Sequence, residues 1–321
     1  MIYTVTLNPT VDRTLTVERF RVGGTFKASH SDLLPAGKGI NVARVVATLG
    51  YPVAALGFVG ERDVTMFRTE LAEAGIDNRL IPVPGSTRSS VTILDPTNHT
   101  ETHLREQGQT PPAGALSEIE EELSRTAPED WVVFAGSLPP GLSAETYRHL
   151  IGVCARRGAR TILDANGPAL LSGAGAPPTV LKPNLFELWQ VDQQQAEATA
   201  EQDLGEWPVA EVLHASRRIQ GRGVSMVVVS RGERGVLGVD RDGRAWKAQV
   251  PLNAPVVDAV GCGDALAGGL VVALARGDAF PEVLRLGAAC GAANTLVAGA
   301  GRCRRADVER LVVHARVDEL C

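Results

Sequence analysis

The sequence predicts an α/β fold: an open, mostly parallel sheet with helices on both faces, plus a small antiparallel β lid. Two observations carry this prediction. From residue 131 onward, apolar strand-like runs alternate with helix-like stretches, as they do in parallel sheets. The segments 11–34 and 87–106 instead contain short strands of mixed polarity, which are too polar for a buried parallel sheet. We expect these two segments to form the lid and residues 1–321 to form a single domain.

Composition narrows the class of protein. The 321 residues are 44% hydrophobic and carry a formal net charge of −5. The chain has no apolar run of about 18 residues and no block of basic residues, so neither a membrane nor nucleic acid is an expected partner. Its five cysteines form no C-x-x-C pair, so neither a zinc site nor a disulfide framework is expected. We expect a cytoplasmic protein.

The first half of the chain gives the following elements in order. A β-branched strand at 2–7 ends at the turn residues Asn8-Pro9. Lid strands are expected at 14–20 and 26–34, and a helix that follows Gly37-Lys38-Gly39 ends at Gly50. The remaining expectations are a strand at 53–59, a helix at 66–74, a lid hairpin of 89–94 and 100–105, and a helix at 116–125.

The second half follows the α/β pattern more regularly. Apolar runs predict strands at 131–135, 161–164, 180–182 and 224–230, and a hairpin of 236–240 with 245–250. Helical spacing predicts helices at 144–157, 264–275 and 281–297. Ligands of such sheets bind at the carboxyl ends of the strands, so the site is expected there.

The most informative stretch runs from Val256 to Gly269. Its apolar start predicts the end of a strand, and Gly261-Cys262-Gly263-Asp264 then leads into a helix. Glycines at a helix N-terminus leave backbone N–H groups free to bind an anion. A carboxylate there would repel the anion, unless it takes a proton from the group that attacks it. From the motif alone, the alternative is that Asp264 caps the helix.

A second glycine turn, Gly37-Lys38-Gly39, leads into the helix that carries Asn41. It is not a P-loop, because Lys38 is followed by glycine rather than by serine or threonine. Lys38 and Asn41 would still lie at the N-terminus of the helix, beside its free N–H groups. A plain strand-to-helix turn is the alternative on local grounds.

Four motifs in this order resemble those of the ribokinase-like (PfkB) carbohydrate kinases, and most closely those of their phosphosugar branch, which includes 1-phosphofructokinases and tagatose-6-phosphate kinases. The motifs are Gly37-Lys38-Gly39-Ile40-Asn41-Val42-Ala43-Arg44, Gly136-Ser137-Leu138-Pro139, Leu181-Lys182-Pro183-Asn184-x-x-Glu187 and Gly261-Cys262-Gly263-Asp264. The resemblance extends from Thr6 to the last helix. The family usually has alanine at the position of Cys262. We favour a buried cysteine that replaces alanine over a reactive thiol with a lowered pKa.

The resemblance implies the chemistry of the site. Asp264 would be the catalytic base that takes the proton of a sugar hydroxyl as its oxygen attacks the γ-phosphorus of ATP. Gly261 and Gly263 would stabilise the transferred phosphoryl through their N–H groups. Asn184 and Glu187 would tune Mg²⁺ binding, with Glu187 acting indirectly through water.

The resemblance also implies which residues bind the nucleotide. Lys182 would lie near the phosphates of ATP, and Ser230, Gly232 and Gly235 would form the nucleotide loop. Asn294 is placed at the edge of the adenine pocket, with a capped or solvent-facing asparagine as an equal alternative.

The expected sugar-phosphate site has two sets of residues. Asp12, Gly37, Lys38, Asn41 and Ser137 would bind the sugar itself, and Lys38 would also contact its phosphate. The cations Lys27, Lys38 and Arg88 suit a doubly charged phosphate. Arg105 is either a further phosphate contact or a solvated surface residue.

These residues together predict an ATP-dependent kinase of a ketohexose phosphate. Fructose 1-phosphate is the favoured substrate, and tagatose 6-phosphate and fructose 6-phosphate are close alternatives. A nucleoside kinase and a non-catalytic sugar-phosphate sensor are less favoured, because the cation cluster and Asp264 are both present. The lid strands have an apolar face to cover, so we expect a homodimer through the lid.

Overall fold

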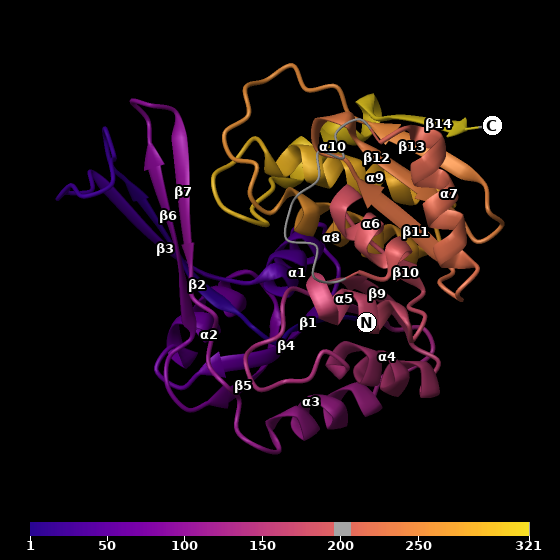
Figure 1. The fold of residues 1–321 in the computed structure, drawn as a ribbon, viewed down its shortest axis with the longest axis horizontal. Helices are drawn as coiled ribbons and strands as arrows, with labels where there is room; N and C mark the ends of the chain where they lie inside the picture. The colour runs from indigo at the N-terminus through magenta and orange to yellow at the C-terminus, as the bar shows by residue number, and fades with distance from the viewer. Residues whose placement is uncertain (196–206, 321) are drawn as a thin grey trace.

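The computed structural model describes residues 1–195 and 207–320. In these residues the chain forms two sheets. The larger has the strand order β14-β13-β12-β11-β10-β9-β8-β1-β4-β5, and the smaller has the order β3-β2-β6-β7. The larger sheet and its helices form the body, and the smaller sheet projects from one side of it (Figure 1). None of the helices in the described ranges is long and apolar enough to span a membrane.

The larger sheet is parallel from β11 to β5, and only β12, β13 and β14 pair antiparallel at one edge. The predicted mostly parallel sheet is therefore confirmed. Its strands are β1 (Ile2–Thr6), β4 (Val53–Gly60), β5 (Asp77–Val83), β8 (Trp131–Ala135), β9 (Arg160–Asp164), β10 (Val180–Leu181), β11 (Met226–Ser230), β12 (Val236–Val239), β13 (Ala245–Gln249) and β14 (Arg316–Leu320).

Helices cover both faces of this sheet, as predicted. One face packs against α1 (Lys38–Thr48), α2 (Val64–Glu73), α8 (Cys262–Arg276), α9 (Phe280–Asn294) and α10 (Arg305–His314). The other face packs against α3 (Ala115–Ser124), α4 (Thr146–Arg156), α5 (Gly167–Ala174), α6 (Leu185–Gln193) and α7 (Val209–Gln220).

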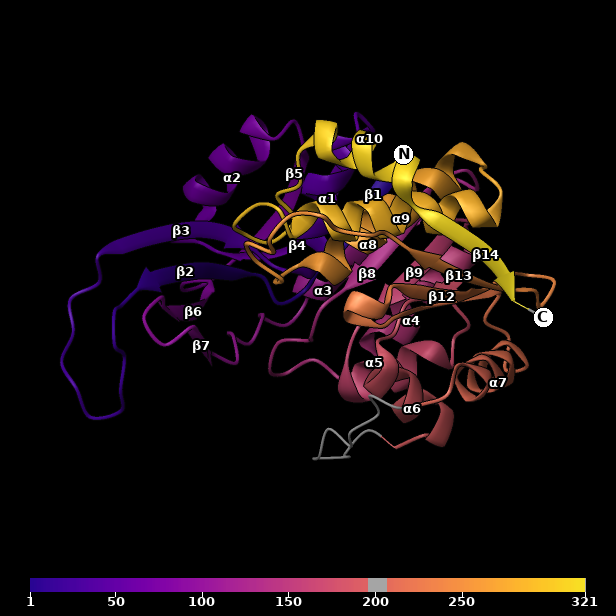
Figure 2. The same cartoon turned by 90° about the horizontal axis from the view of Figure 1, so that it is seen from above.

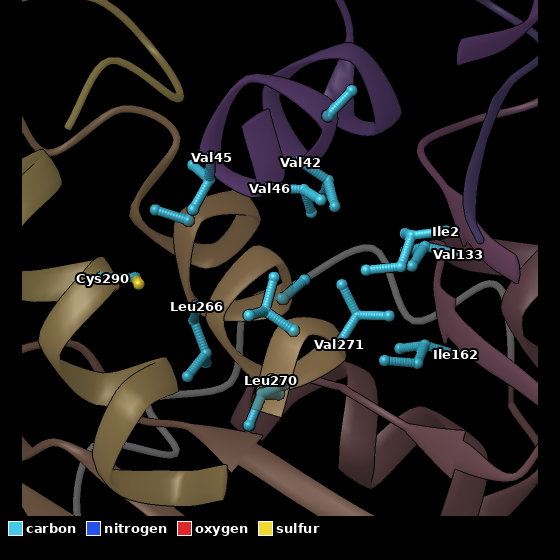
Figure 3. Close-up of a cluster of buried hydrophobic side chains, with 14 of the residues drawn as sticks. Ile2, Val42, Val45, Val46, Val133, Ile162, Leu266, Leu270, Val271 and Cys290 are labelled. Carbon is cyan, nitrogen blue, oxygen red and sulfur yellow. The ribbon is translucent and has the colours of Figure 1, made fainter. Parts of the chain in front are cut away.

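Two hydrophobic cores result, because successive strand residues point to opposite faces. Ile2 contributes to the core under α1 and α8, whereas Tyr3 contributes to the core on the other side. In the first core, the valines of α1 face α8 (Figure 3), and the two helices approach closely at Gly268, where a Cβ atom would lie 2.7 Å from Val45 Cβ. This packing fixes the start of α8 relative to the start of α1, and the two glycine turns stand at these two starts.

The smaller sheet is the predicted lid, built from β2 (Thr10–Thr16), β3 (His30–Ala36), β6 (Arg88–Asp95) and β7 (Thr100–Arg105). It consists of two antiparallel hairpins, β2–β3 and β6–β7, which are joined by a parallel pairing of β2 with β6. The strands β2 and β3 lie about four residues from the predicted positions. The loop 17–29 forms the outer end of the first hairpin, far from the body (Figure 2).

Some elements differ from the sequence-based expectations. The predicted strand end at Val256 and Val257 is wrong: both side chains are more than half exposed, in a loop that runs from β13 to α8. The strands β5 and β14 were not expected. Both are edge strands with many polar residues, and Pro82 is tolerated in β5 because an edge strand need not donate every N–H. The helices α5, α6, α7 and α10 were not expected either.

Candidate active site

The site lies where the carboxyl ends of the central strands meet. Asn8 follows β1, Ser137 follows β8, Asp164 ends β9, and Lys182 follows β10. These strands are parallel neighbours, so their carboxyl ends share one edge of the sheet. The lid strands leave the body at this edge, and the N-termini of α1 and α8 face it.

Asp264 lies in the first turn of α8 and is buried. Gly261, which caps the helix, has φ 80°, and a Cβ atom there would lie 2.5 Å from the Cβ of Ala300. Only glycine fits this turn. Asp264 Oδ2 accepts a hydrogen bond of 2.7 Å from Asn41 Nδ2. The predicted helix start at the Gly-x-Gly-Asp turn is confirmed.

The pKa of Asp264 is raised to about 6. Burial is the main cause, because it disfavours the charged carboxylate; Asp164 adds to the shift, while Lys38, Asn41 and Lys182 oppose it. A carboxylate with a pKa near 6 is ionised at neutral pH and still binds a proton readily. Those are the requirements of a general base.

Asp164 forms the centre of the site and was not identified from the sequence. Its Oδ1 lies 3.0 Å from Lys38 Nζ, and its Oδ2 lies 3.1 Å from Lys182 Nζ. Burial opposes its ionisation, but Lys182 and Lys38 hold the pKa of Asp164 below its ordinary value. It therefore fixes two cations at the strand ends. The only signal in the sequence is an acid that ends a strand, directly after the apolar pair Ile162-Leu163.

The two lysines make this region suitable for an anion. Burial opposes the charge of Lys38, yet Asp164, Asp264 and Glu187 raise its pKa above the ordinary value, so it stays cationic. A Cβ atom on Gly263 would lie 3.6 Å from Lys182 Nζ, so the start of α8 adjoins that ammonium group. Free helical N–H groups beside two cations are suited to bind phosphate.

Asn184 and Glu187 form a capping box at the start of α6. The side chain of Asn184 accepts from Glu187 N at 2.8 Å, and Glu187 Oε2 accepts from Asn184 N at 2.8 Å. Burial raises the pKa of Glu187. The backbone hydrogen bond to Oε2 fixes the orientation of this carboxylate at the start of α6. The described residues contain no group of three or more acidic, histidine or cysteine side chains that would hold a metal by themselves.

The predicted nucleotide loop follows β11. Ser230 N donates to Pro183 O at 3.0 Å, so this loop lies beside the Lys182–Asn184 segment. Gly232 and Gly235 both have positive φ, and a Cβ on Gly235 would lie 2.3 Å from Ala248 O. The structure thus brings Lys182, Asn184 and Ser230 together.

Asn294 is fully buried behind the Gly261 turn. Its Nδ2 donates to Val260 O at 2.8 Å, and its Oδ1 accepts from Gly301 N at 2.9 Å. This is a capped asparagine that shapes the turn, and its place at the adenine pocket stays a prediction. Cys262 is half-buried rather than buried as expected, and burial raises the pKa of its thiol, which argues against the alternative of a reactive thiol with a lowered pKa.

The lid contributes Asp12 and Arg88 to the site. Thr10 pairs with Arg88 and Asp12 with Ser90 across β2 and β6, so Asp12 and Arg88 share one face of the lid. Burial raises the pKa of Asp12. The Arg88 guanidinium donates to the carbonyls of Asn8, Pro9 and Glu106 at 3.1–3.4 Å, which anchors it at the base of the lid.

The residues of the body that were predicted to bind the sugar are Gly37, Lys38, Asn41 and Ser137. Gly37 has φ 134°, and a Cβ there would lie 2.7 Å from Thr6 Cγ2, so the turn requires glycine. Ser137 Oγ accepts a hydrogen bond of 3.1 Å from Asn8 Nδ2. Asn8 was not identified as a site residue, although the family resemblance begins at Thr6-Leu7-Asn8-Pro9.

Lys27 does not join this group. It is exposed in the loop 17–29, beyond the outer ends of β2 and β3. The predicted cluster of Lys27, Lys38 and Arg88 is therefore not assembled within one chain, because the seven-residue strand β2 separates the loop from the site. Arg105 is also exposed, at the end of β7.

Fold and site together define a phosphoryl-transferring enzyme of the ribokinase-like class: a buried carboxylate at a glycine-flanked helix start and paired lysines, at the carboxyl edge of a sheet covered by helices on both faces. The sequence matches the pfkB family of carbohydrate kinases over residues 5–307. It is 34% identical to a 1-phosphofructokinase of Rhodobacter capsulatus over 90% of this chain and 88% of that protein.

Two further relatives support the same family. An ATP-dependent 6-phosphofructokinase isozyme 2 of Mycobacterium tuberculosis is 34% identical over 96% of this chain and 88% of that protein. The solved structure of phosphofructokinase-2 from Escherichia coli in complex with substrates and products superposes with a TM-score of 0.88 at 27% identity, covering 97% of this chain and 98% of that one. The chain belongs to the pfkB family of carbohydrate kinases.

Proposed function

We propose that this protein is an ATP-dependent 1-phosphofructokinase, which transfers the γ-phosphoryl group of ATP to fructose 1-phosphate and releases fructose 1,6-bisphosphate. The observation that carries the kinase chemistry is the buried Asp264, with a pKa of about 6, beside an anion site that contains Lys38 and Lys182. The choice of fructose 1-phosphate rests on relatives that are named 1-phosphofructokinase. Fructose 6-phosphate and tagatose 6-phosphate remain the alternatives.

In the proposed reaction, Asp264 takes the proton of the sugar hydroxyl. The hydroxyl oxygen forms a bond to the γ-phosphorus, the bond from that phosphorus to the β–γ bridging oxygen breaks, and its electron pair leaves with ADP. Lys182, Lys38 and the N–H groups at Gly261 and Gly263 stabilise the charge on the transferred phosphoryl. Asp164 holds both lysines in place.

Mg²⁺ would bind mainly to phosphate oxygens and water, as it usually does in kinases, and would neutralise charge on ATP. Glu187 would orient one of the metal-bound waters, and Asn184 fixes that carboxylate. Ser230, Gly232 and Gly235 would bind the nucleotide. On the sugar side, Asp12, Gly37, Asn41 and Ser137 would bind hydroxyl groups.

ADP release from a panel of acceptors tests the proposal directly. The panel contains fructose 1-phosphate, fructose 6-phosphate, tagatose 6-phosphate, unphosphorylated fructose and a nucleoside, each with ATP and Mg²⁺. We expect the highest kcat/KM with fructose 1-phosphate and the lowest with the two unphosphorylated acceptors. A nucleoside that reacts fastest, or no ADP release with any sugar phosphate, would contradict the proposal.

Removing Arg88 is expected to weaken the binding of the sugar phosphate selectively. A charge-assisted hydrogen bond contributes about 1.5–3 kcal/mol. Arg88→Ala should therefore raise the KM of fructose 1-phosphate by about one to two orders of magnitude, while the KM of ATP barely changes. Steady-state kinetics in both substrates measure this difference.

Arg222→Ala is the matched control, because Arg222 also donates to two backbone carbonyls but belongs to the far end of the body, after α7. It should leave both KM values unchanged. If Arg88→Ala raises the KM of ATP as much as that of the sugar phosphate, Arg88 does not belong to the sugar site.

We also propose that the lid forms a homodimer. Cross-strand partners place Leu33, Arg13, Val91 and Leu104 in one row across β3, β2, β6 and β7, on the face opposite Asp12 and Arg88. Leu33 and Leu104 are about half exposed, at 48% and 58%. Cover from a second lid would bury this apolar face and remove the exposed sheet from solvent.

Sedimentation at micromolar concentration tests the dimer. The wild type should sediment as a dimer, and Leu33→Asp combined with Leu104→Asp should sediment as a monomer. Val313→Asp is the control, since Val313 is 78% exposed on α10, away from the lid. A monomeric wild type, or a dimer that survives the double substitution, would count against the lid interface.

A further inference from the structure

Arg44 is a buried cation in α1 whose contacts lead to the catalytic base. Its side chain is 5% exposed. One guanidinium nitrogen, Nη1, donates to Asn41 Oδ1 at 3.1 Å. The other, Nη2, donates to Pro35 O and lies 3.3 Å from Glu70 Oε1. Burial lowers the pKa of Arg44 to about 10, so it remains charged at neutral pH.

The contact with Asn41 settles the orientation of its amide. An arginine side chain only donates hydrogen bonds, so it must face the oxygen of Asn41 and not the nitrogen. The nitrogen then points to Asp264, where Nδ2 donates to Oδ2 at 2.7 Å. With the amide turned over, an oxygen would face the carboxylate of Asp264, and two acceptors would repel each other.

A third contact connects the same guanidinium to the lid. Pro35 lies in β3, and this strand leads through Gly37 directly into α1, which packs against α8 (Figure 2). A movement of the lid that shifts the Pro35 carbonyl therefore acts on the group that orients Asn41. Glu70 balances the charge of Arg44 from α2.

We propose that Arg44 is a positioning residue for the reaction: it fixes the amide of Asn41 so that Asp264 receives a hydrogen bond, and it couples this arrangement to lid strand β3. The inference rests on the proposed role of Asp264 as the base. Arg44 itself contacts neither substrate in this account. Its effect reaches the reaction only through Asn41.

The pH dependence of the reaction reports on this coupling. The charged groups that act on Asp264 are Lys38 from α1, Asp164 from β9 and Lys182 after β10. All three charged groups are still present when Arg44 is replaced. Loss of the Asn41 hydrogen bond removes an interaction that favours the ionised form, so the pKa of Asp264 rises. The acid limb of the kcat profile should then move to higher pH.

Full-length Arg44→Met, Arg44→Lys and Arg302→Met are the variants to compare, with fructose 1-phosphate and ATP. Arg44→Met should lower kcat by about tenfold to a hundredfold and move the acid limb upward by about one pH unit. Arg44→Lys keeps a cation that only donates hydrogen bonds. It should therefore show a smaller fall in kcat and a smaller shift of the acid limb than Arg44→Met. Arg302 also pairs with Glu70, at 3.6 Å, but the side-chain hydrogen bonds of Asn41 go to Arg44 and Asp264 instead, so Arg302→Met should match the wild type.

A double variant separates positioning from packing. If Arg44 acts through Asn41, adding Arg44→Met to Asn41→Leu should lower kcat no further. An Arg44→Met enzyme with a lower melting temperature but normal kcat and acid limb would overturn the proposal. The proposal would also be overturned if Arg44→Met lowered kcat in the Asn41→Leu background by the same factor as in the wild type.

Two safeguards keep the test decisive. If Arg44→Met does not fold, Asn41→Leu carries the test, because it removes the group through which Arg44 is proposed to act on Asp264; an unchanged acid limb in Asn41→Leu would also overturn the proposal. The proposed function fails differently: Asp264→Asn would then keep its turnover, whatever the Arg44 variants show.

Discussion

The Asp264→Asn enzyme is expected to lose turnover while it keeps its affinity for ATP. Asparagine retains the size of the side chain and still meets Asn41 at the helix start, but it accepts no proton. Loss of a general base typically lowers a rate by about 10²–10⁴-fold, so kcat should fall at least about a hundredfold. ATP affinity, measured by calorimetry, should be unchanged or higher, because a negative charge beside the phosphates is gone.

Cys262→Ala is the control for this prediction. Cys262 lies in the same turn, and its thiol has a raised pKa and therefore stays neutral. Its replacement leaves the backbone N–H groups in place and should leave kcat near the wild-type value. An Asp264→Asn enzyme that turned over normally would remove Asp264 from the mechanism and leave it as a partner of Asn41 alone.

The Asp164→Asn enzyme is expected to lose both stability and activity. Asp164 is 1% exposed and is the counter-charge of Lys182, which is almost as deeply buried. Removing one partner of a buried ion pair leaves the other charge uncompensated, and this typically costs about 3–5 kcal/mol. The free energy of unfolding, measured with denaturant, should fall by that amount. Both lysines lose their anchor, so kcat/KM should fall by about a hundredfold or more.

Asp192→Asn provides the matched control. Asp192 is also buried, at 2% side-chain exposure, and lies 2.6 Å and 3.9 Å from the guanidinium nitrogens of Arg218 and Arg222, at the far end of α6. This substitution should lower stability but leave kcat unchanged. If Asp164→Asn lowers stability with no greater loss of activity than Asp192→Asn, then Asp164 is a structural residue alone.

The sequence predicted those parts of the fold that depend on local pattern. Buried parallel strands such as β8 consist of continuous apolar residues, and helices such as α8 follow helical spacing after glycine turns. The edge strands β5 and β14 lack this pattern because solvent reaches one side of each. Val256 and Val257 satisfy the pattern but lie in an exposed loop, because position in the tertiary fold decides burial.

The site was predicted where a motif contains the residue, and missed where only a tertiary contact reveals it. Asp264, Lys38 and Lys182 lie in the quoted motifs and do meet at the strand ends. Asp164 was predicted only as the end of a strand, because its function depends on two lysines 126 and 18 residues away along the chain. Lys27 was misplaced because the length of the lid strands is not apparent from charge alone.

The dependence of kcat on pH, for the wild type and for Asp264→Asn with saturating fructose 1-phosphate and ATP, tests the central claim most directly. The carboxylate must be ionised to accept a proton, so the logarithm of the wild-type kcat should rise with unit slope on the acid side of the pKa of Asp264, which is about 6 without substrates, and then level off. Phosphate monoesters also titrate near pH 6, so the variant is essential to the measurement. We predict that its small residual kcat lacks this acid limb. The same limb in both enzymes would assign the titration to a substrate phosphate and contradict the role of Asp264 as the base.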